Sequence, residues 1–182
     1  MYIGHFSRHC VCVSEVGQIT SSKQTFTHAT MTPIYYEDLE PGRVFVSPGR
    51  TITEADLTQF AMVSGDWHPI HTNTEYARQT PFGQRIVHGP FGIAIALGLF
   101  GRLGGFEDTA IALLDLSAWK FVLPMFIGDT IHLEMRIAGR RLASDGRRGI
   151  VDRHMKLIRQ DGAVVQDGHA GLMIACRESK KG

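Results

Sequence analysis

Titratable side chains are concentrated in one short segment, Ser64-Gly65-Asp66-Trp67-His68-Pro69-Ile70-His71. Asp66 and His71 lie five residues apart on either side of Pro69, which prevents a continuous helix through the segment. A turn here can therefore direct a carboxylate and an imidazole toward one point. Such a pair can move protons, because aspartate is a base at neutral pH and histidine can gain or lose a proton. The alternative interpretation is a structural hydrogen bond between the two side chains.

Helix signals surround this segment. Thr53 is a favourable N-cap, and Asp56 can complete a capping box three residues later. Apolar residues then recur at helical spacing until Gly65, a typical C-terminal residue, and Asn73 can cap a second, short helix. The rest of the stretch between Gly65 and Gly89 is irregular, and long irregular connections inside a compact domain are often functional.

A long apolar helix is predicted next. Pro90 suits its first turn and Gly104-Gly105 suit its end, while the residues between them are apolar on nearly all sides, which predicts a buried helix. Gly98, Gly101 and Gly104 recur every third residue. They either let another backbone approach closely or are simply tolerated, with one of them near a C-cap.

Period-two alternation characterises the remainder of the chain. Runs at residues 114–121, 131–137, 150–158 and 170–175 alternate between apolar and polar side chains and are separated by turn residues. They predict an antiparallel meander with one face in water, and residues 43–52 predict a further, bent strand. One long helix wrapped by a curved antiparallel sheet is an α+β fold.

Length and composition exclude several classes of protein. The chain has 182 residues, enough for one domain with its own core. Its net charge of +1 argues against general electrostatic binding to nucleic acid or to an anionic membrane. The longest strongly apolar stretch, 90–101, is too short to span a membrane. The N-terminal residues show no compact apolar segment after a basic start, which disfavours secretion. The three cysteines form no CxxC pair, which predicts free thiols and no zinc site. We therefore expect a cytoplasmic protein.

Residues 1–30 differ in composition from the rest of the chain. They are rich in Ser, Thr and His, and the pattern of a compact domain begins only after Met31. We interpret residues 1–30 as an N-terminal extension outside the fold and residues 31–182 as the domain. An additional edge strand at residues 11–13 is the alternative.

Residues 60–77 resemble the signature of the R-specific enoyl-CoA hydratases, in the MaoC-like hot-dog dehydratase family. The signature is an aromatic residue, two residues, an aliphatic residue, Ser-Gly-Asp-x-Asn-Pro-aliphatic-His, five residues and a small residue. Its elements are present here as Phe60, Val63, Ser64, Gly65, Asp66, Pro69, Ile70, His71 and Ala77. One position departs from it, since His68 stands where the family has Asn. Residues 81–83, 86–89, 121–124 and 128–129 look like later family segments, so the resemblance covers about residues 34–176.

The resemblance implies a single hot-dog domain, a homodimer with its sites near the subunit interface, and an acyl-CoA thioester as substrate. It implies that Asp66 and His71 together hold and activate one water for addition across a 2,3-enoyl double bond. It also implies that the Gly89 amide donates to the thioester oxygen, on which enolate charge develops. No metal or redox cofactor is needed for this chemistry.

Three other residues are candidates for substrate binding. His88, directly before Gly89, either contacts substrate or makes a structural cap or loop hydrogen bond. Trp67 either lines the acyl pocket or packs against a neighbouring loop. His68 either ties down its own loop or lies at the water site or acyl pocket, where it would tune substrate choice. Trp119 is interpreted as a core or interface residue.

Two other functions stay open at this point. One is an acyl-CoA thioesterase on the same fold, in which a carboxylate activates water against the thioester carbonyl. The other is a non-catalytic acyl-CoA-binding module, because a fold alone does not fix an activity. The Asp-x-x-Pro-x-His pattern favours the hydratase over the thioesterase. The intact pair of Asp66 and His71 argues against a binding module, which has no need of both.

Overall fold

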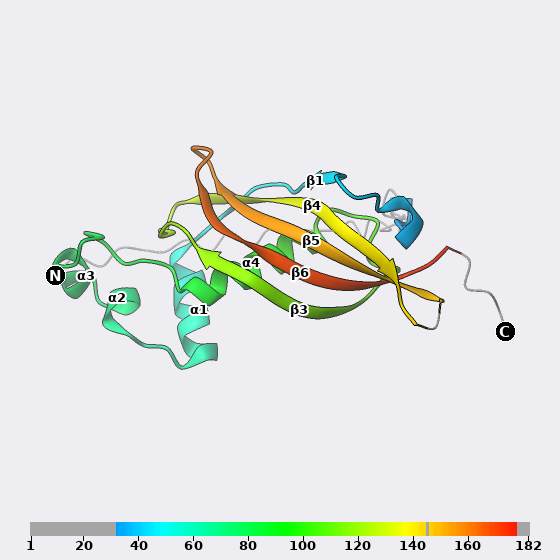
Figure 1. Cartoon of the computed structure of the whole chain (residues 1–182). Coiled ribbons are helices and arrows are strands. Elements are labelled where there is room, and N and C mark those ends of the chain that lie inside the picture. The colour runs from blue at the N-terminus through cyan, green and yellow to red at the C-terminus, as the bar shows by residue number, and fades with distance from the viewer. Residues whose placement is uncertain (1–31, 145, 178–182) are drawn as a thin grey trace, which may run out of the picture. The chain divides into compact units, whose positions relative to one another are not determined.

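The computed structural model describes residues 32–144 and 146–177. The prediction that residues 1–30 form an extension concerns a segment outside the described residues and stays a prediction. Within the described residues, six strands form one antiparallel sheet (Figure 1). They are β1 (Val44–Val46), β2 (Arg50–Thr51), β3 (Ala110–Phe121), β4 (Thr130–Leu142), β5 (Arg148–Arg159) and β6 (Val164–Ala175).

The order of the strands is β1-β4-β5-β6-β3, and β2 also pairs with β4. The predicted meander is confirmed for β4, β5 and β6, and the predicted bent strand is present as β1 and β2. The position of β3 differs from a simple meander, because β3 lies beside β6 and not beside β4. The connection after β3 explains this, since it does not form a tight hairpin. It runs back to the segment before α4, where the Val87 N–H donates to the Met125 carbonyl at 2.8 Å.

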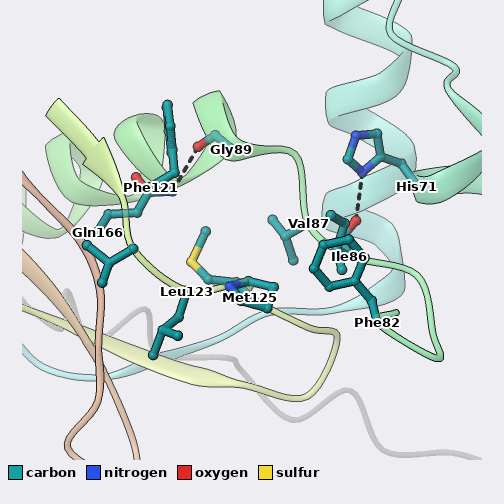
Figure 2. A pocket seen from close by; sticks show the side chains of 11 residues that line it. His71, Phe82, Ile86, Val87, Gly89, Phe121, Leu123, Met125 and Gln166 are labelled. Atoms are coloured by element: carbon teal, nitrogen blue, oxygen red, sulfur yellow. Dashed lines mark hydrogen bonds between the residues drawn. The ribbon is translucent and has the colours of Figure 1, made fainter. Parts of the chain in front are cut away.

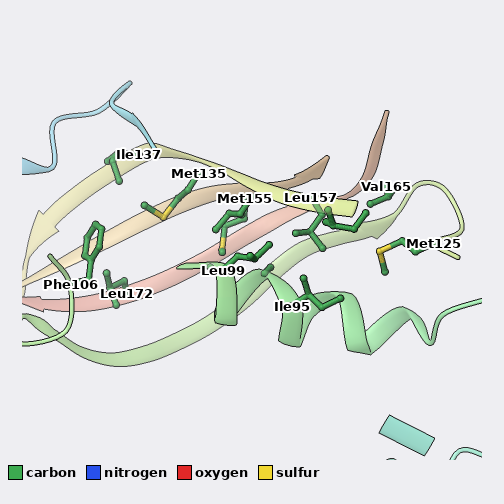
Figure 3. Packing of buried hydrophobic residues seen from close by; sticks show 14 of the residues in the cluster. Ile95, Leu99, Phe106, Met125, Met135, Ile137, Met155, Leu157, Val165 and Leu172 are labelled. Carbon is green, nitrogen blue, oxygen red and sulfur yellow. The ribbon is translucent and has the colours of Figure 1, made fainter. Parts of the chain in front are cut away.

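Helix α4 (Gly89–Gly101) lies along one face of the sheet, and its side chains form the core with the inward residues of β4, β5 and β6 (Figure 3). Ile95 and Leu99 are buried there against Met155 and Leu157. The prediction of burial on nearly all sides is only partly right. Ala94 and Gly98 are exposed, because the sheet covers one side of the helix. The α+β class is confirmed.

Strand β3 also differs from its prediction. Alternation predicted one buried and one wet face, but nearly all of its residues are exposed. The reason is its place at the end of the sheet, where α4 and the other strands cover it least. Ala110 and Trp119 are the exceptions, since both are partly buried and pack against the core. Large apolar side chains are therefore exposed on this strand, at Ile111, Leu113, Leu114 and Leu116.

Three short helices gather at one end of the sheet (Figure 1). They are α1 (Glu54–Ser64), α2 (Pro69–Thr72) and α3 (Thr74–Arg78), and a 3₁₀ turn (Tyr36–Asp38) precedes β1. The predicted cap of α1 is confirmed, because the Thr53 N–H donates to the Asp56 carboxylate at 2.8 Å. Asn73 caps α3 through the Tyr76 N–H, also as predicted. In the described part of the chain, no helix has both the length and the apolar character needed to cross a membrane.

Candidate active site

Local turns place Asp66 and His71 at the end of α1. Gly65 ends that helix with φ of 74°, a left-handed conformation that favours glycine, and it directs the chain away from the helix axis. The Asp66 carboxylate then accepts the N–H of His68 at 3.2 Å. His68 in turn is the N-cap of α2, the short helix that carries His71. The turn predicted around Pro69 therefore brings the two titratable side chains together.

The Asp66 Oδ2 and the His71 Nε2 are 3.9 Å apart. This distance is too long for a hydrogen bond, so the two side chains do not form the direct bond that was the alternative interpretation. It suits one water that contacts both atoms, because each contact would need about 2.8 Å. Asp66 is half exposed and the His71 side chain is mostly buried, so the gap lies at the boundary between solvent and protein.

The proton on neutral His71 is fixed by its surroundings. The Nδ1 lies 2.8 Å from the Ile86 carbonyl oxygen, which can only accept, so the Nδ1 carries the hydrogen and the Nε2 keeps its lone pair (Figure 2). Burial lowers the pKa of His71 below its ordinary value of 6.5. The hydrogen bond to Ile86 and the charge of Asp66 raise this pKa, and His88 lowers it further, but burial dominates. His71 is therefore neutral at pH 7, with an acceptor nitrogen facing Asp66.

His88 links the members of this cluster. It is 1% exposed, its Nε2–H donates to the Asp66 backbone carbonyl at 3.0 Å, and its ring stacks on the His71 ring with centroids 3.8 Å apart. This is the loop hydrogen bond that the sequence offered as one of two roles. Within the described residues its Nδ1 has no partner.

An apolar cavity of about 330 Å³ opens beside His71 (Figure 2). Its walls come from the loop before α4 and from the end of β3 with the loop after that strand. Among the described residues that line it, only His71 and Gln166 have polar side chains. An apolar cavity with few convergent polar groups is the usual form of a small-molecule site.

Gly89 also lines this cavity. It is the first residue of α4, so its N–H has no acceptor within the helix. Its carbonyl accepts a hydrogen bond from the Gln166 Nε2 at 2.9 Å. The Phe121 ring lies so close that a Cβ at position 89 would be 3.1 Å from it. The structure thus brings Gly89 and His71 to the same cavity.

Two predicted binding residues lie elsewhere. The His68 Nδ1 accepts the N–H of Ile70 at 3.2 Å, which fits the role of tying down the loop. Trp67 is 54% exposed and is not among the described residues lining the apolar cavity. It lines a smaller cavity of about 160 Å³ on another side of His71, together with Glu54 and Arg85. Their effect on substrate choice stays a prediction.

Sequence reasoning missed Gln166, and it assigned Trp119 only to the core or an interface. The Trp119 indole N–H donates to the Gln166 Oε1 at 3.0 Å. One signal could have pointed to a close contact: Gly92 interrupts an apolar helix. A Cβ there would lie 2.1 Å from the Gln166 Nε2. Within the described structure, a Cβ at Gly98 or Gly101 would meet nothing within 4 Å, so these two fit the alternative of tolerated glycines and not that of a close backbone contact.

The ligand atoms of Asp66, His71 and His88 lie within 4.8 Å of one another, which is the spacing of a potential metal site in the described residues. The stacking of the two rings disfavours that use. Their centroids are 3.8 Å apart with only 25° between the planes, so the in-plane lone pairs of His71 and His88 lie in two separate, nearly parallel planes and cannot both point at one cation. The arrangement fits proton transfer better.

Comparison with known proteins gives a consistent result. A family model described as "MaoC like domain" matches residues 38–156. "Protein MaoC" of Klebsiella aerogenes is 39% identical over 101 residues, which is 56% of this chain but 30% of that protein. An (R)-specific enoyl-CoA hydratase of Rhodospirillum rubrum is 35% identical over 106 residues, covering 58% of this chain and 70% of the relative. The chain thus spans less than a third of the length of Protein MaoC.

Solved structures show the same fold. The MaoC-like dehydratase from Rhodospirillum rubrum superposes with a TM-score of 0.72 and 26% identity, over 80% of this chain and 99% of that one. A Mycobacterium tuberculosis protein described as a double hot-dog fold superposes with a TM-score of 0.70 over 82% of this chain and 46% of that one, at 20% identity. The predicted hot-dog fold is confirmed.

Proposed function

Because the chain belongs to the family of MaoC-like dehydratase domains, we propose that it is a hydro-lyase that reversibly adds water to a 2-enoyl-CoA thioester. The product would be the 3-hydroxyacyl-CoA, and we propose the R isomer because the Rhodospirillum rubrum relative is named an (R)-specific enoyl-CoA hydratase. One observation carries the proposal. An Asp66–His71 separation of 3.9 Å, suited to one water that contacts both side chains, adjoins an apolar cavity that Gly89 also lines.

The proposed reaction begins with a water held between the Asp66 carboxylate and the His71 Nε2. The pair takes one proton from this water, and the oxygen forms a bond to C3 of the enoyl group. The π electrons of the C2–C3 bond move toward the thioester, where the carbonyl oxygen becomes an enolate oxygen. C2 then takes a proton back from the pair, which completes the addition of one water.

The Gly89 N–H would stabilise the enolate oxygen. An amide at the start of a helix has no internal partner, and the helix dipole adds partial positive charge there. Removal of one such donor typically costs about 2.7–4 kcal/mol of transition-state stabilisation. The apolar walls would hold the acyl chain and strengthen this interaction by excluding water.

We also propose that the chain forms a homodimer that covers β3. This strand ends the sheet and exposes several large apolar side chains, among them Ile111 and Leu113. Exposed apolar strands at a sheet edge are normally covered in a stable protein. The mass in solution, measured by light scattering after size-exclusion chromatography, should be twice that of the chain. The variant Leu113→Asp should shift this mass toward the monomer.

The activity is tested with enoyl-CoA substrates of several lengths and branching patterns. Loss of the enoyl absorbance should accompany formation of the 3-hydroxyacyl-CoA, and chiral analysis should give the R isomer. The variant Asp66→Asn is the matched control for contaminating hydratase. Release of free CoA from acyl-CoA would instead indicate a thioesterase. Binding of acyl-CoA with neither reaction would indicate a binding module.

A further inference from the structure

Gln166 is a polar side chain in an apolar environment. It lies on β6, is 2% exposed, and extends toward the first turn of α4, where it lines the apolar cavity (Figure 2). Burying an amide is costly unless its donors and acceptors find partners, so such a residue needs a structural or functional explanation. The hydrogen bonds of Gln166 provide such an explanation.

Two hydrogen bonds hold the carboxamide in one orientation. The Trp119 indole N–H donates to its Oε1 at 3.0 Å, and its Nε2–H donates to the Gly89 carbonyl at 2.9 Å. An indole N–H can only donate and a carbonyl can only accept, so the oxygen and nitrogen of the amide cannot be exchanged. Trp119 is therefore connected to the start of α4 through Gln166.

The packing around the carboxamide is equally restrictive. A Cβ at Gly92 would lie 2.1 Å from the Gln166 Nε2, so the amide occupies the volume that a side chain would take there. The Phe121 ring approaches Gly89 in the same turn, 3.1 Å from where a Cβ would lie. The first turn of α4 is thus held by one amide and one ring.

The contacts around the first turn of α4 matter because Gly89 has no side chain of its own to fix its backbone conformation. Glycine has the widest conformational freedom of any residue, and a misdirected amide cannot stabilise a negative oxygen. We propose that Gln166 is a positioning residue, which fixes the Gly89 carbonyl and so directs the Gly89 N–H into the cavity, and that Trp119 anchors Gln166. This inference rests on the proposed hydration, in which that N–H holds the enolate oxygen.

The test replaces Gln166 with methionine, which has a similar length but no amide. Complete loss of an oxyanion donor costs 10²–10³-fold in kcat, so a misaligned one should cost about 10- to 100-fold, while KM changes by less than about threefold. Gln59→Met is the matched control on an exposed glutamine of α1, and it should leave kcat and KM unchanged. A kcat of Gln166→Met within twofold of the wild type would overturn the proposal.

Trp119→Phe tests the connection, because Trp119 is not among the described residues that line the cavity. It should lower kcat about 3- to 10-fold, since the amide keeps one of its two anchors. The double variant should be no slower than Gln166→Met, because Trp119 acts through Gln166. Multiplicative losses in the double variant would contradict this connection. The assays are run well below the melting temperature of each variant, so that unfolding does not contribute.

A second measurement does not depend on activity. In nuclear magnetic resonance spectra, the Gly89 amide should give a single sharp signal in the wild type and a broadened or shifted one in Gln166→Met. An unchanged signal would overturn the positioning role even if kcat fell. If the wild type showed no hydration at all, the proposed function would fail, while this signal would still report whether Gln166 orders Gly89.

Discussion

Gly92→Ala is a demanding test of the packing at the start of α4. The added methyl carbon would lie 2.1 Å from the Nε2, 2.5 Å from the Cδ and 2.6 Å from the Oε1 of Gln166. All three distances are shorter than any contact that a Cβ makes in real proteins. The carboxamide must therefore move, and because it is buried, its bonds to Trp119 and Gly89 cannot simply be replaced by bonds to water.

The magnitude follows from these two bonds. The two lost hydrogen bonds cost about 2 kcal/mol together, and one buried group that stays without a partner adds about 1–3 kcal/mol. Alanine in a helix returns about 0.5–1 kcal/mol relative to glycine. The free energy of unfolding should therefore fall by about 2–4 kcal/mol. At about 2–4 °C for each kcal/mol in a protein of this size, the melting temperature should fall by roughly 4–16 °C.

Gly98→Ala is the matched control, because it makes the same change in the same helix where a Cβ would meet nothing within 4 Å. Only the higher helix propensity of alanine over glycine then acts, so the melting temperature of Gly98→Ala should rise by about 1–4 °C. Both variants are measured by calorimetry at one protein concentration. A Gly92→Ala protein as stable as the wild type, or two variants shifted in the same direction, would refute this reasoning.

Four further predictions concern the site and the N-terminus. Asp66→Asn and His71→Ala should each lower kcat by about 10²–10⁴-fold, with the fold intact by circular dichroism, and the double variant should lose little more. A kcat above a tenth of the wild-type value in Asp66→Asn would contradict the catalytic role of Asp66. Because burial lowers the pKa of His71, its imidazole resonance should titrate below pH 6.5, and kcat/KM should fall only below that pH. The midpoint of this titration should drop further in Asp66→Asn, since the Asp66 carboxylate stabilises the imidazolium. His68→Asn should leave the pH profile and substrate preference unchanged if the ring only caps its loop, whereas a shift in either would place it at the site. A chain that begins at Met31 should keep its melting temperature and activity; a clear fall would show that residues 1–30 pack on the domain.

The fold was predictable where it depends on local chemistry. The cap made by Thr53 and Asp56, and the end of α1 at Gly65, follow from residues within one turn of each other. The place of β3 was not predictable in this way. Its partner β6 begins more than forty residues after β3 ends, and alternation in a sequence does not tell which strands pair.

In the candidate site, too, features that depend on nearby residues were predictable and features that depend on distant residues were not. Asp66 and His71 stand out because they share one short segment, and the resemblance to a family adds Gly89. The buried carboxamide of Gln166 stayed hidden, because it lies 77 residues from the carbonyl that it holds. The hydrogen bond from His71 to Ile86 was also hidden, since a backbone carbonyl leaves no trace in a sequence.

The fixed proton on the His71 Nδ1 has a stereochemical consequence for the proposed hydration. Because the Nδ1 is bonded to the Ile86 carbonyl, only the Nε2 can exchange protons with the substrate, and it would contact the same water as Asp66. The oxygen that adds to C3 and the hydrogen that arrives at C2 would then reach the flat enoyl group from one side. Addition would be syn, so that in heavy water the new deuterium and the new hydroxyl group enter on the same face of the former double bond.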